Sequence, residues 1–395
     1  MSKKIKGLRR NIIVYKTVRF LFGRLFKRIY RFSYTPYKPQ SDSFILVANH
    51  TNAVDPLLEG IAFPQYLRYV ASEHLLRKGF VAAAIRFLVN PIPKRRGGDS
   101  AEAVRMIIDT LQSGVNVCIH AEGYVSINGE TGYISPNTAK MVKDAGAAML
   151  IYRFTGGYFC RPRWSDARRR GPIHGEVVRE YTQEDIAKMS LDEIDAAIRG
   201  DLYVNAFDVQ RSDPKKYKGK KLAEHLETLL YVCPVCKQIG TMHSRDNELF
   251  CECGYKLIYN EYGFFEGENL IFDNALDWDK WQVRHIKEIL PELKDIKDKP
   301  VCSDEKQLLF IISGKDKVPL EEECVMKLYP DRLEFSGENT HVFSFDTITH
   351  MAMGGSTRIN FTCGSGFYEV NSKIKRSALK YYVLFRLLSG EEYYN

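Results

Sequence analysis

Residues 44–56 read FILVANHTNAVDP, and the rest of the chain is best interpreted outward from them. Five consecutive apolar residues, 44–48, predict a buried strand that stops abruptly at Asn49 and His50. Asp55 follows one tight turn later. A carboxylate that accepts a hydrogen bond from one imidazole nitrogen fixes the tautomer, so that the other nitrogen can take a proton from a hydroxyl. His50 and Asp55 are therefore candidate catalytic residues, with His50 as the general base.

The same residues also allow a purely structural interpretation. Asp55 stands directly before Pro56, and an N-cap carboxylate followed by proline is typical of a helix start. A histidine and an aspartate five residues apart also arise by chance. The remainder of the sequence has to decide between a catalytic pair and a capped helix.

The composition indicates an ordinary globular protein of two or three domains. The chain has 395 residues, of which 45% are hydrophobic and 27% charged. Nine cysteines, an odd number without a secretion signal, predict a reducing compartment. Because no apolar run approaches the ~20 residues that span a bilayer, we expect neither a signal peptide nor a transmembrane helix.

The positive charge is confined to one end of the chain. Residues 1–40 hold twelve Lys and Arg and no Asp or Glu, although the whole chain carries a net charge of +8. The remainder is therefore slightly acidic, which argues against a general nucleic-acid surface and predicts no nucleic-acid partner.

Within residues 1–40, apolar and basic positions separate on a projected helix. The apolar positions are Val14, Val18, Leu21, Leu25, Ile29 and Phe32, and the basic ones opposite are Lys16, Arg19, Arg24, Lys27 and Arg31. This pattern predicts an amphipathic helix that lies in an anionic membrane interface. We therefore expect a peripheral or monotopic protein on the cytoplasmic face of the cell membrane. The alternative is a helix that packs on its own domain and exposes a solvated basic side.

Residues 41–210 alternate between predicted strands and predicted helices. The strands are expected at 44–48, 67–70, 115–119 and 149–152, and the helices at 56–61, 78–89, 100–111, 138–145 and 191–207. Such alternation predicts a layered α/β domain around a central parallel or mixed sheet. The charged, proline-containing stretch at 211–222 predicts a linker.

Two cysteine pairs follow the linker. Cys233 and Cys236 are separated by fourteen residues from Cys251 and Cys253, a spacing that predicts a zinc ribbon over residues 229–260. Four thiolates would close the coordination shell, so we expect a structural zinc. Because the second pair is Cys-x-Cys, His243 is an alternative fourth ligand, and buried free thiols are the other alternative.

Residues 300–395 are β-rich. Short alternating runs between 306 and 371 precede a predicted helix at 377–388. Six or seven antiparallel strands and one C-terminal helix resemble pleckstrin-homology-like domains.

Three further segments accompany His50 and Asp55 in order along the chain. They are IPKRRG at 92–97, HAEG at 120–123, and AAMLI at 147–151 followed by RFTGG at 153–157. Together with residues 49–55 they resemble the four motifs of the glycerolipid acyltransferases typified by lysophosphatidic acid acyltransferase. The zinc-ribbon extension resembles a bacterial branch of that family.

The resemblance implies a role for each motif residue. His50 would remove the proton from a glycerol hydroxyl, and Asp55 would orient and stabilise the imidazole. Arg95 and Arg96 would bind the phosphate of the acceptor, since guanidinium groups bind phosphate oxygens bidentately. Glu122 and Gly123 would shape the acceptor site. The donor would be an acyl thioester of acyl carrier protein or coenzyme A, and the acceptor a lysophospholipid, 1-acylglycerol 3-phosphate in the first instance, which gives phosphatidate.

Two residues depart from the family pattern. Tyr124 and Val125 follow Glu-Gly where the family usually has a small polar residue and an arginine. The departure puts the identity of the acceptor in question. It also motivates a second hypothesis, a degenerate acyltransferase that serves as a lipid-binding scaffold and contacts proteins through its zinc ribbon. The intact His50 and Asp55 favour the enzyme.

Overall fold

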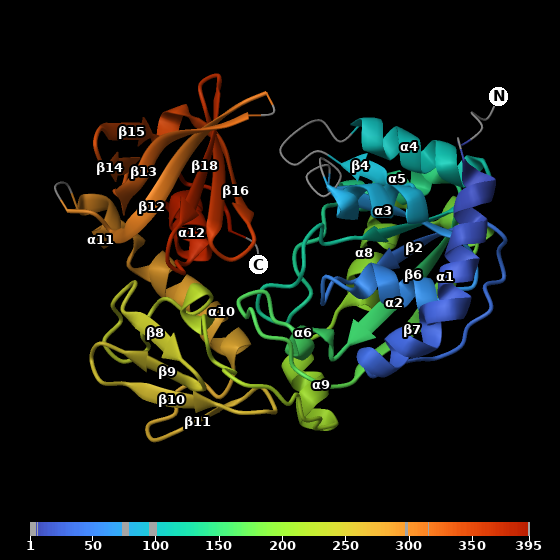
Figure 1. Cartoon of the computed structure of the whole chain (residues 1–395), viewed down its shortest axis with the longest axis horizontal. Helices are drawn as coiled ribbons and strands as arrows, with labels where there is room; N and C mark the ends of the chain where they lie inside the picture. Colours follow the sequence, from blue (N-terminus) through green and yellow to red (C-terminus); the bar gives the residue numbers. More distant parts are fainter. Residues whose placement is uncertain are drawn as a thin grey trace. The chain divides into compact units, whose positions relative to one another are not determined.

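The computed structural model describes residues 5, 7–72, 79–94, 101–296, 299–314 and 316–393. The chain divides into two compact units, which are described separately (Figure 1). The first contains Met1–Pro162 and Arg169–Tyr217, and the second contains Arg163–Arg168 and Lys218–Asn395.

A seven-stranded mixed sheet forms the centre of the first unit, in the order β1-β7-β6-β2-β5-β3-β4. Its strands are β1 (Phe32–Tyr34), β2 (Phe44–Ala48), β3 (Leu67–Ser72), β4 (Ile92–Lys94), β5 (Asn116–His120), β6 (Ala148–Thr155) and β7 (Ile173–Tyr181). The pairs from β6 to β4 are parallel, β6 and β7 are antiparallel, and β1 is parallel to β7. The predicted α/β class with a central mixed sheet is thus confirmed.

Helices lie on both faces of this sheet. They are α1 (Leu8–Ile29), α2 (Asp55–Ala62), α3 (Phe80–Val89), α4 (Ala101–Gln112), α5 (Asn137–Ala145), α6 (Gly157–Cys160), α7 (Gln183–Lys188), α8 (Leu191–Leu202) and α9 (Ala206–Ser212). Ile45 and Val47 of β2 pack into one core cluster with α4, α5, α7 and α8. Phe44 points the opposite way and meets Phe63 after α2. Every residue of β2 is buried, as expected of a central parallel strand.

The short elements β1, β4, α6 and α7 were not predicted, and Phe32, expected on the N-terminal helix, lies in β1. Two longer parts of the first unit also differ from the prediction. Strand β7 was not predicted, because its sequence IHGEVVREY mixes polar and apolar residues and only Ile173 and Gly175 are buried. The helix predicted at 191–207 is two helices, α8 and α9. Asn205 ends the continuity, since its side-chain oxygen accepts hydrogen bonds from the backbone of Phe207 and Asp208 and so caps α9.

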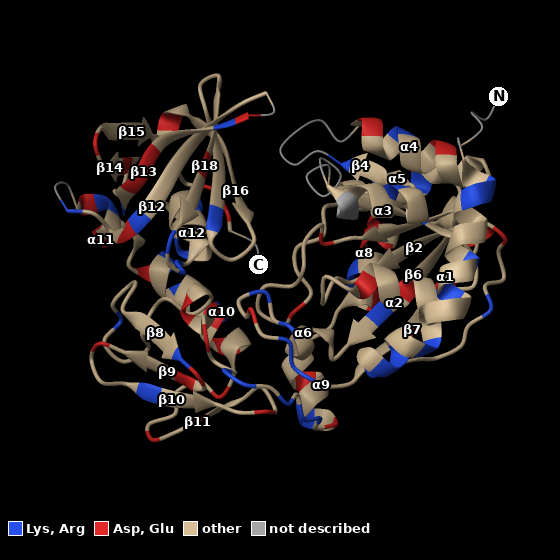
Figure 2. Ribbon diagram, viewed as in Figure 1, with Lys and Arg blue, Asp and Glu red and all other residues tan. Residues whose placement is uncertain are grey.

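Helix α1 packs on its own unit through a face that the apolar pattern did not identify. The residues buried there are Asn11, Tyr15 and Gly23. The Tyr15 hydroxyl donates to the carbonyl of Phe63, 3.0 Å away. Large apolar side chains remain exposed instead, with Phe20 at 84% and Leu21 at 60%. Basic residues also occur along this helix (Figure 2). Within the described part of the chain, no helix is long and apolar enough to cross a membrane.

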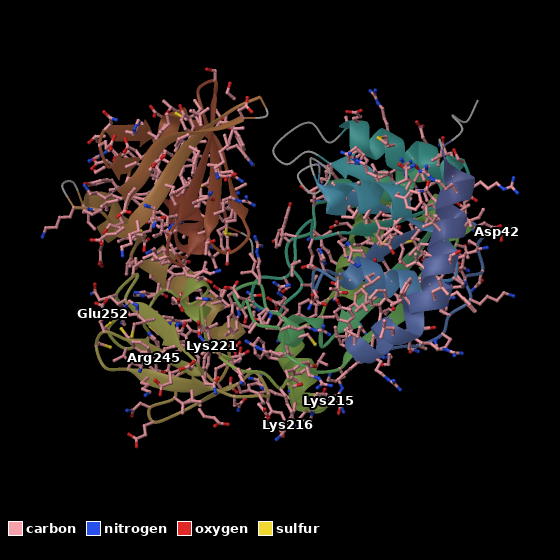
Figure 3. The ribbon with its side chains drawn as sticks, viewed as in Figure 1. Asp42, Lys215, Lys216, Lys221, Arg245 and Glu252 are labelled. Atoms are coloured by element: carbon pink, nitrogen blue, oxygen red, sulfur yellow. The ribbon has the colours of Figure 1, made fainter. Side chains whose placement is uncertain are left out.

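The second unit combines a small sheet with a larger one. The four-stranded sheet contains β8 (Met242–Arg245), β9 (Glu248–Cys251), β10 (Lys256–Tyr259) and β11 (Phe265–Glu266), and α10 (Ala275–Glu288) and α11 (Leu290–Asp295) follow it. Trp278 of α10 is fully buried, and its indole donates to the carbonyl of Val232, 2.9 Å away. The last segment of the first unit ends at Tyr217, and the exposed Lys215 and Lys216 just before it are labelled in Figure 3.

The larger sheet is antiparallel and has the order β15-β14-β13-β12-β18-β17-β16. Its strands are β12 (Cys302–Ser313), β13 (Asp316–Leu328), β14 (Arg332–Ser336), β15 (Thr340–Ser344), β16 (Ile348–Gly354), β17 (Arg358–Cys363) and β18 (Gly366–Ser372), followed by α12 (Ala378–Leu388). Helix α12 buries most of its residues, so it belongs to the core of the unit. The β-rich C-terminal region is confirmed, whereas its likeness to pleckstrin-homology domains stays a prediction.

Candidate active site

The catalytic histidine predicted from the sequence lies just past the carboxyl end of β2. Asn49 fixes the strand end, because its side chain donates to the carbonyl of Phe154 at 3.0 Å and accepts from the Phe154 amide at 2.7 Å. The His50 amide donates to Glu122 at 2.7 Å, and its carbonyl accepts from the Ser126 amide at 2.7 Å. Both the amide and the carbonyl of His50 are therefore hydrogen-bonded, which fixes its backbone. The orientation of the imidazole depends on separate contacts of the side chain.

Asp55 sets the orientation of that side chain. Its Oδ2 lies 3.1 Å from Nδ1 of His50 and accepts from the amides of Thr51 at 2.6 Å and Asn52 at 2.8 Å. The Asp55 side chain is fully buried, whereas that of His50 is 16% exposed. Because Nδ1–H donates to Asp55, Nε2 is the nitrogen that can accept a proton.

The capping alternative for Asp55 is only partly right. Asp55 is the first residue of α2, but the N-cap is Val54 and no side chain caps the helix. The Asp55 carboxylate binds the amides of the turn that precedes the helix and not those of the helix itself. It therefore holds the turn between His50 and α2 in place.

Glu122 closes the loop behind the histidine. One carboxylate oxygen accepts from the His50 amide and the other from the Gly132 amide, both at 2.7 Å. Burial raises the pKa of Glu122 to about 7, against the effect of those two hydrogen bonds. Gly123 has a φ of 72°, the left-handed conformation that glycine adopts most readily. Glu122 thus acts on the position of His50 and of the 126–132 loop.

The fourth sequence motif brings a glycine against the catalytic turn. A Cβ on Gly157 would lie 2.1 Å from Oγ1 of Thr51 and 3.7 Å from Cβ of Asn52. The Asn52 side chain also donates to the carbonyl of Gly157 at 3.0 Å. The close approach of backbone and turn explains why a residue without a side chain is needed at the start of α6.

The predicted phosphate-binding residues Arg95 and Arg96 lie outside the described residues. Their neighbour Lys94 ends β4 and is exposed. Tyr124, one of the departures from the family pattern, extends its hydroxyl toward Gly132, where a Cβ would lie 3.0 Å from that oxygen. The described structure therefore brings together His50, Asp55, Glu122 and Gly123 among the predicted site residues.

Sequence reasoning missed two residues beside His50. Glu59 of α2 is completely buried, and its Oε1 lies 3.2 Å from Nε2 of His120 at the end of β5. The rings of His120 and His50 are stacked, with centroids 4.1 Å apart and planes at 26°. Glu59 was detectable as an acidic residue one helical turn after Asp55, and His120 as the first residue of the HAEG motif.

Two groups of side chains have the composition of metal ligands. The first is His50, Asp55 and His120, whose donor atoms lie within 4.8 Å of one another. We assign no metal to it, because Nδ1 of His50 and Oδ2 of Asp55 are already paired with each other.

The second group is the predicted cysteine set, Cys233, Cys236, Cys251 and Cys253, whose sulfur atoms lie within 4.8 Å of one another. Sγ–Sγ distances of 3.8 Å for Cys233–Cys253 and 3.7 Å for Cys236–Cys251 match the edge of about 3.8 Å in a tetrahedron with Zn–S bonds near 2.3 Å. His243 instead lies 3.1 Å from Glu252, a residue of the second knuckle labelled in Figure 3. The four thiols fit zinc, with His243 outside the set.

Two comparisons with known proteins gave a match. Residues 31–154 match the model of the family described as Acyltransferase. Among solved structures, the 1-acyl-sn-glycerophosphate (LPA) acyltransferase PlsC of Thermotoga maritima is similar at 20% identity and a TM-score of 0.43, over 55% of this chain and 86% of that one. No curated protein matches the chain. The family match over residues 31–154 thus supports the predicted acyltransferase domain, and the matched range includes His50, Asp55, Glu122 and Gly123.

Proposed function

We propose that this chain, which carries an acyltransferase-family domain over residues 31–154, moves a fatty acyl group from a thioester to the hydroxyl of a lysophospholipid. The observation that carries the proposal is the buried Asp55 carboxylate 3.1 Å from Nδ1 of His50, at the open end of a parallel strand. A buried charge is costly unless it is paired and hydrogen-bonded, and the hydrogen bond of Asp55 to His50 fixes the tautomer that a general base requires.

The reaction follows from that geometry. Nε2 of His50 accepts the proton of the acceptor hydroxyl as its oxygen attacks the thioester carbonyl, and Asp55 stabilises the imidazolium that forms. The C–O bond forms, the C–S bond of the tetrahedral intermediate breaks, and the proton on His50 passes to the leaving thiolate. Assistance of this kind typically contributes about 10²–10⁴ in rate.

We propose 1-acylglycerol 3-phosphate as the acceptor and phosphatidate as the product, with Arg95 and Arg96 binding the phosphate. Support comes from the first half of the IPKRRG motif, which is strand β4 and pairs with β3, with Lys94 opposite Ser72. Val125 stands where an arginine is usual, so phosphate binding depends more heavily on Arg95 and Arg96.

The test is an acyl-transfer assay on the purified full chain. Lysophosphatidate, lysophosphatidylglycerol, lysophosphatidylcholine and monoacylglycerol are each offered with acyl coenzyme A and with acyl carrier protein, and products are identified by mass spectrometry. Phosphatidate formation is expected from lysophosphatidate. Arg96→Gln is expected to raise KM for lysophosphatidate but not for monoacylglycerol, and Arg105→Gln, an exposed position on α4, is the control. Absence of an acyl product with every pair would favour the lipid-binding scaffold.

We also propose that the cysteine set holds one structural zinc ion. Cys233, Cys236, Cys251 and Cys253 would supply four thiolates, which leave no position for a substrate. The metal would stabilise the short β8–β11 sheet by cross-linking its two turns.

Finally, we propose that α1 binds the anionic face of the cytoplasmic membrane. Its support is the combination of exposed Phe20 and Leu21 with neighbouring basic residues such as Arg24. Co-sedimentation with phosphatidylglycerol vesicles is expected and should weaken with salt and with Phe20→Glu. Equal binding to phosphatidylcholine vesicles would contradict the electrostatic part.

A further inference from the structure

Helix α2 carries two buried carboxylates on one face. Asp55 and Glu59 are four residues apart, a spacing that places them one above the other on a helix. The neighbouring parallel strands β2 and β5 end beside these carboxylates, and Ala48 of β2 pairs with His120 of β5. His50 follows β2 by two residues, so each carboxylate receives one histidine. The site thus contains two His–carboxylate pairs where the chemistry of a general base uses one.

The two groups of the second pair lie nearly as close as those of the first, as an ion-pair contact whose facing atoms do not meet hydrogen-bond geometry. Oε1 of Glu59 lies 3.2 Å from Nε2 of His120, and Sγ of Cys118 donates to Oε2 of Glu59 at 3.2 Å. The Glu59 side chain is fully buried and that of His120 is 10% exposed. The His120 ring covers one face of His50, with the centroids 4.1 Å apart.

Burial and mutual attraction act in opposite directions on the charges of this pair. Burial raises the pKa of Glu59, and the nearby His120 works against that rise. Burial lowers the pKa of His120, but the Glu59 carboxylate outweighs this effect and the pKa of His120 is raised overall. An ionised buried carboxylate that accepts no backbone amide hydrogen bonds is stabilised chiefly by a nearby cation. Among the described residues, the cation paired with Glu59 is His120.

Other titratable groups around the two histidines come from several elements. The carboxylates are Asp55 and Glu59 on α2 and Glu122 after β5. The remaining groups are the Cys118 thiol on β5 and the phenols of Tyr15 on α1, Tyr69 on β3 and Tyr152 on β6, whose pKa values are all raised by burial, so they stay neutral. His120 is therefore the group that can place a positive charge against the face of His50.

We propose that His120, ion-paired with Glu59, is a positioning residue for His50: its ring fixes the plane of the His50 ring, and its charge keeps His50 in the neutral, proton-accepting form. This inference rests on the proposed role of His50 as general base. A positive charge about 4 Å away disfavours a proton on His50 before the substrate arrives. Asp55 favours that proton, so the two neighbours act in opposite directions and set the pH at which His50 titrates.

The first test measures the protonation state of the wild-type chain. In protein labelled with ¹⁵N-histidine, the imidazole nitrogens report the protonation of each ring as pH changes, and His120→Phe identifies the His120 signals by their loss. We expect His120 to carry protons on both nitrogens at pH 7 and His50 on one. A singly protonated His120 at pH 7 would overturn the proposal.

Two variants then separate the charge from the ring. His120→Phe keeps a flat ring against His50 but removes the charge, and Glu59, without its cation, takes up a proton. His120→Lys keeps the charge but not the ring. We expect the titration midpoint of His50 to rise by about one pH unit in His120→Phe and to stay near the wild-type value in His120→Lys. A midpoint that is unchanged or falls in His120→Phe would overturn the charge role.

Acyl transfer measured against pH supplies the functional readout. The acidic limb of kcat/KM should move to higher pH by the same amount in His120→Phe, because more His50 is protonated at a given pH. In His120→Lys the limb should stay in place while kcat falls at all pH values, since the ring plane is lost. An unmoved limb in His120→Phe together with an unchanged kcat in His120→Lys would overturn the proposal. Absence of acyl transfer in the wild type would contradict the proposed function instead, and the titration of His50 would still decide the effect of His120.

Discussion

Asp55→Asn is the substitution that isolates the carboxylate from everything else in the site. An amide oxygen can still accept from the amides of Thr51 and Asn52, which donate to Oδ2 at 2.6 and 2.8 Å, so the turn is retained. The asparagine amide does not select the Nδ1–H tautomer of His50, because its own NH₂ group can donate to Nδ1 instead. The imidazole is then free to adopt the other tautomer, in which Nε2 carries the proton and cannot act as a base.

The expected magnitude follows from these contacts. Loss of the correct tautomer should remove most of the general-base contribution, a fall in kcat of about 10³-fold with KM nearly unchanged. The buried charge-assisted hydrogen bonds become neutral ones, each weaker by roughly 1 kcal/mol, while the cost of burying a charge disappears. We therefore expect the free energy of unfolding to fall by no more than about 2 kcal/mol.

The assay measures thiol release from acyl coenzyme A with the acceptor at saturation, and urea unfolding gives the stability. Asp109→Asn, at an exposed position on α4, is the matched control and should leave both quantities unchanged. A kcat within threefold of wild type in Asp55→Asn would refute the reasoning, because the buried carboxylate would then be structural only.

Three further predictions concern the rest of the chain. In the folded chain burial raises the pKa of Glu122 to about 7, above the ordinary value of 4.5, so the native state binds more protons than the unfolded state between these pH values. The free energy of unfolding should therefore fall by up to about 3 kcal/mol as pH rises from 4.5 to 7. Urea unfolding at each pH measures this dependence, and Glu122→Gln should reduce it. Metal analysis should find one zinc ion per chain, lost in Cys233→Ser but kept in Cys363→Ser, whose thiol is outside the cluster; equal zinc in both variants would contradict the site. Gly157→Ala should lower the free energy of unfolding by about 1–3 kcal/mol and lower kcat, because its Cβ would lie 2.1 Å from Oγ1 of Thr51. In the control Gly200→Ala, in α8, the added Cβ meets nothing within 4 Å, so the change should be neutral or stabilising by up to about 1 kcal/mol. Equal thermal stability of the two variants would contradict the prediction, because the catalytic turn would then accommodate the Cβ without loss of stability.

The parts of the fold that were predictable carry their signal in local sequence. Strand β2 is entirely apolar and buried, and α2 begins at Asp55 with Pro56 in its first turn, so pattern and structure agree. The family motifs also placed His50 and Asp55 correctly relative to each other, because the spacing within a tight turn leaves little freedom.

The parts that were not predictable depend on contacts between distant segments. Strand β7 is stabilised by pairing with β1 and β6, which its mixed sequence does not reveal. The face of α1 that packs on the unit depends on Tyr15, whose hydroxyl donates to the carbonyl of Phe63, a contact that apolar periodicity does not reveal. Glu59 and His120 are 61 positions apart in sequence. The parallel pairing of β2 with β5 brings the His120 imidazole next to the Glu59 carboxylate, and local sequence does not reveal that pairing.

The most direct test of the central claim is the rate of acyl transfer by His50→Gln beside wild type, with lysophosphatidate and acyl coenzyme A or acyl carrier protein, whichever donor the wild type uses. Glutamine has a similar size and can still accept from a neighbouring donor, but it cannot take the proton of a hydroxyl. We predict a loss of at least about 10²-fold in kcat with unchanged unfolding by urea. Turnover at the wild-type rate by the folded variant would contradict the assignment of His50 as the base.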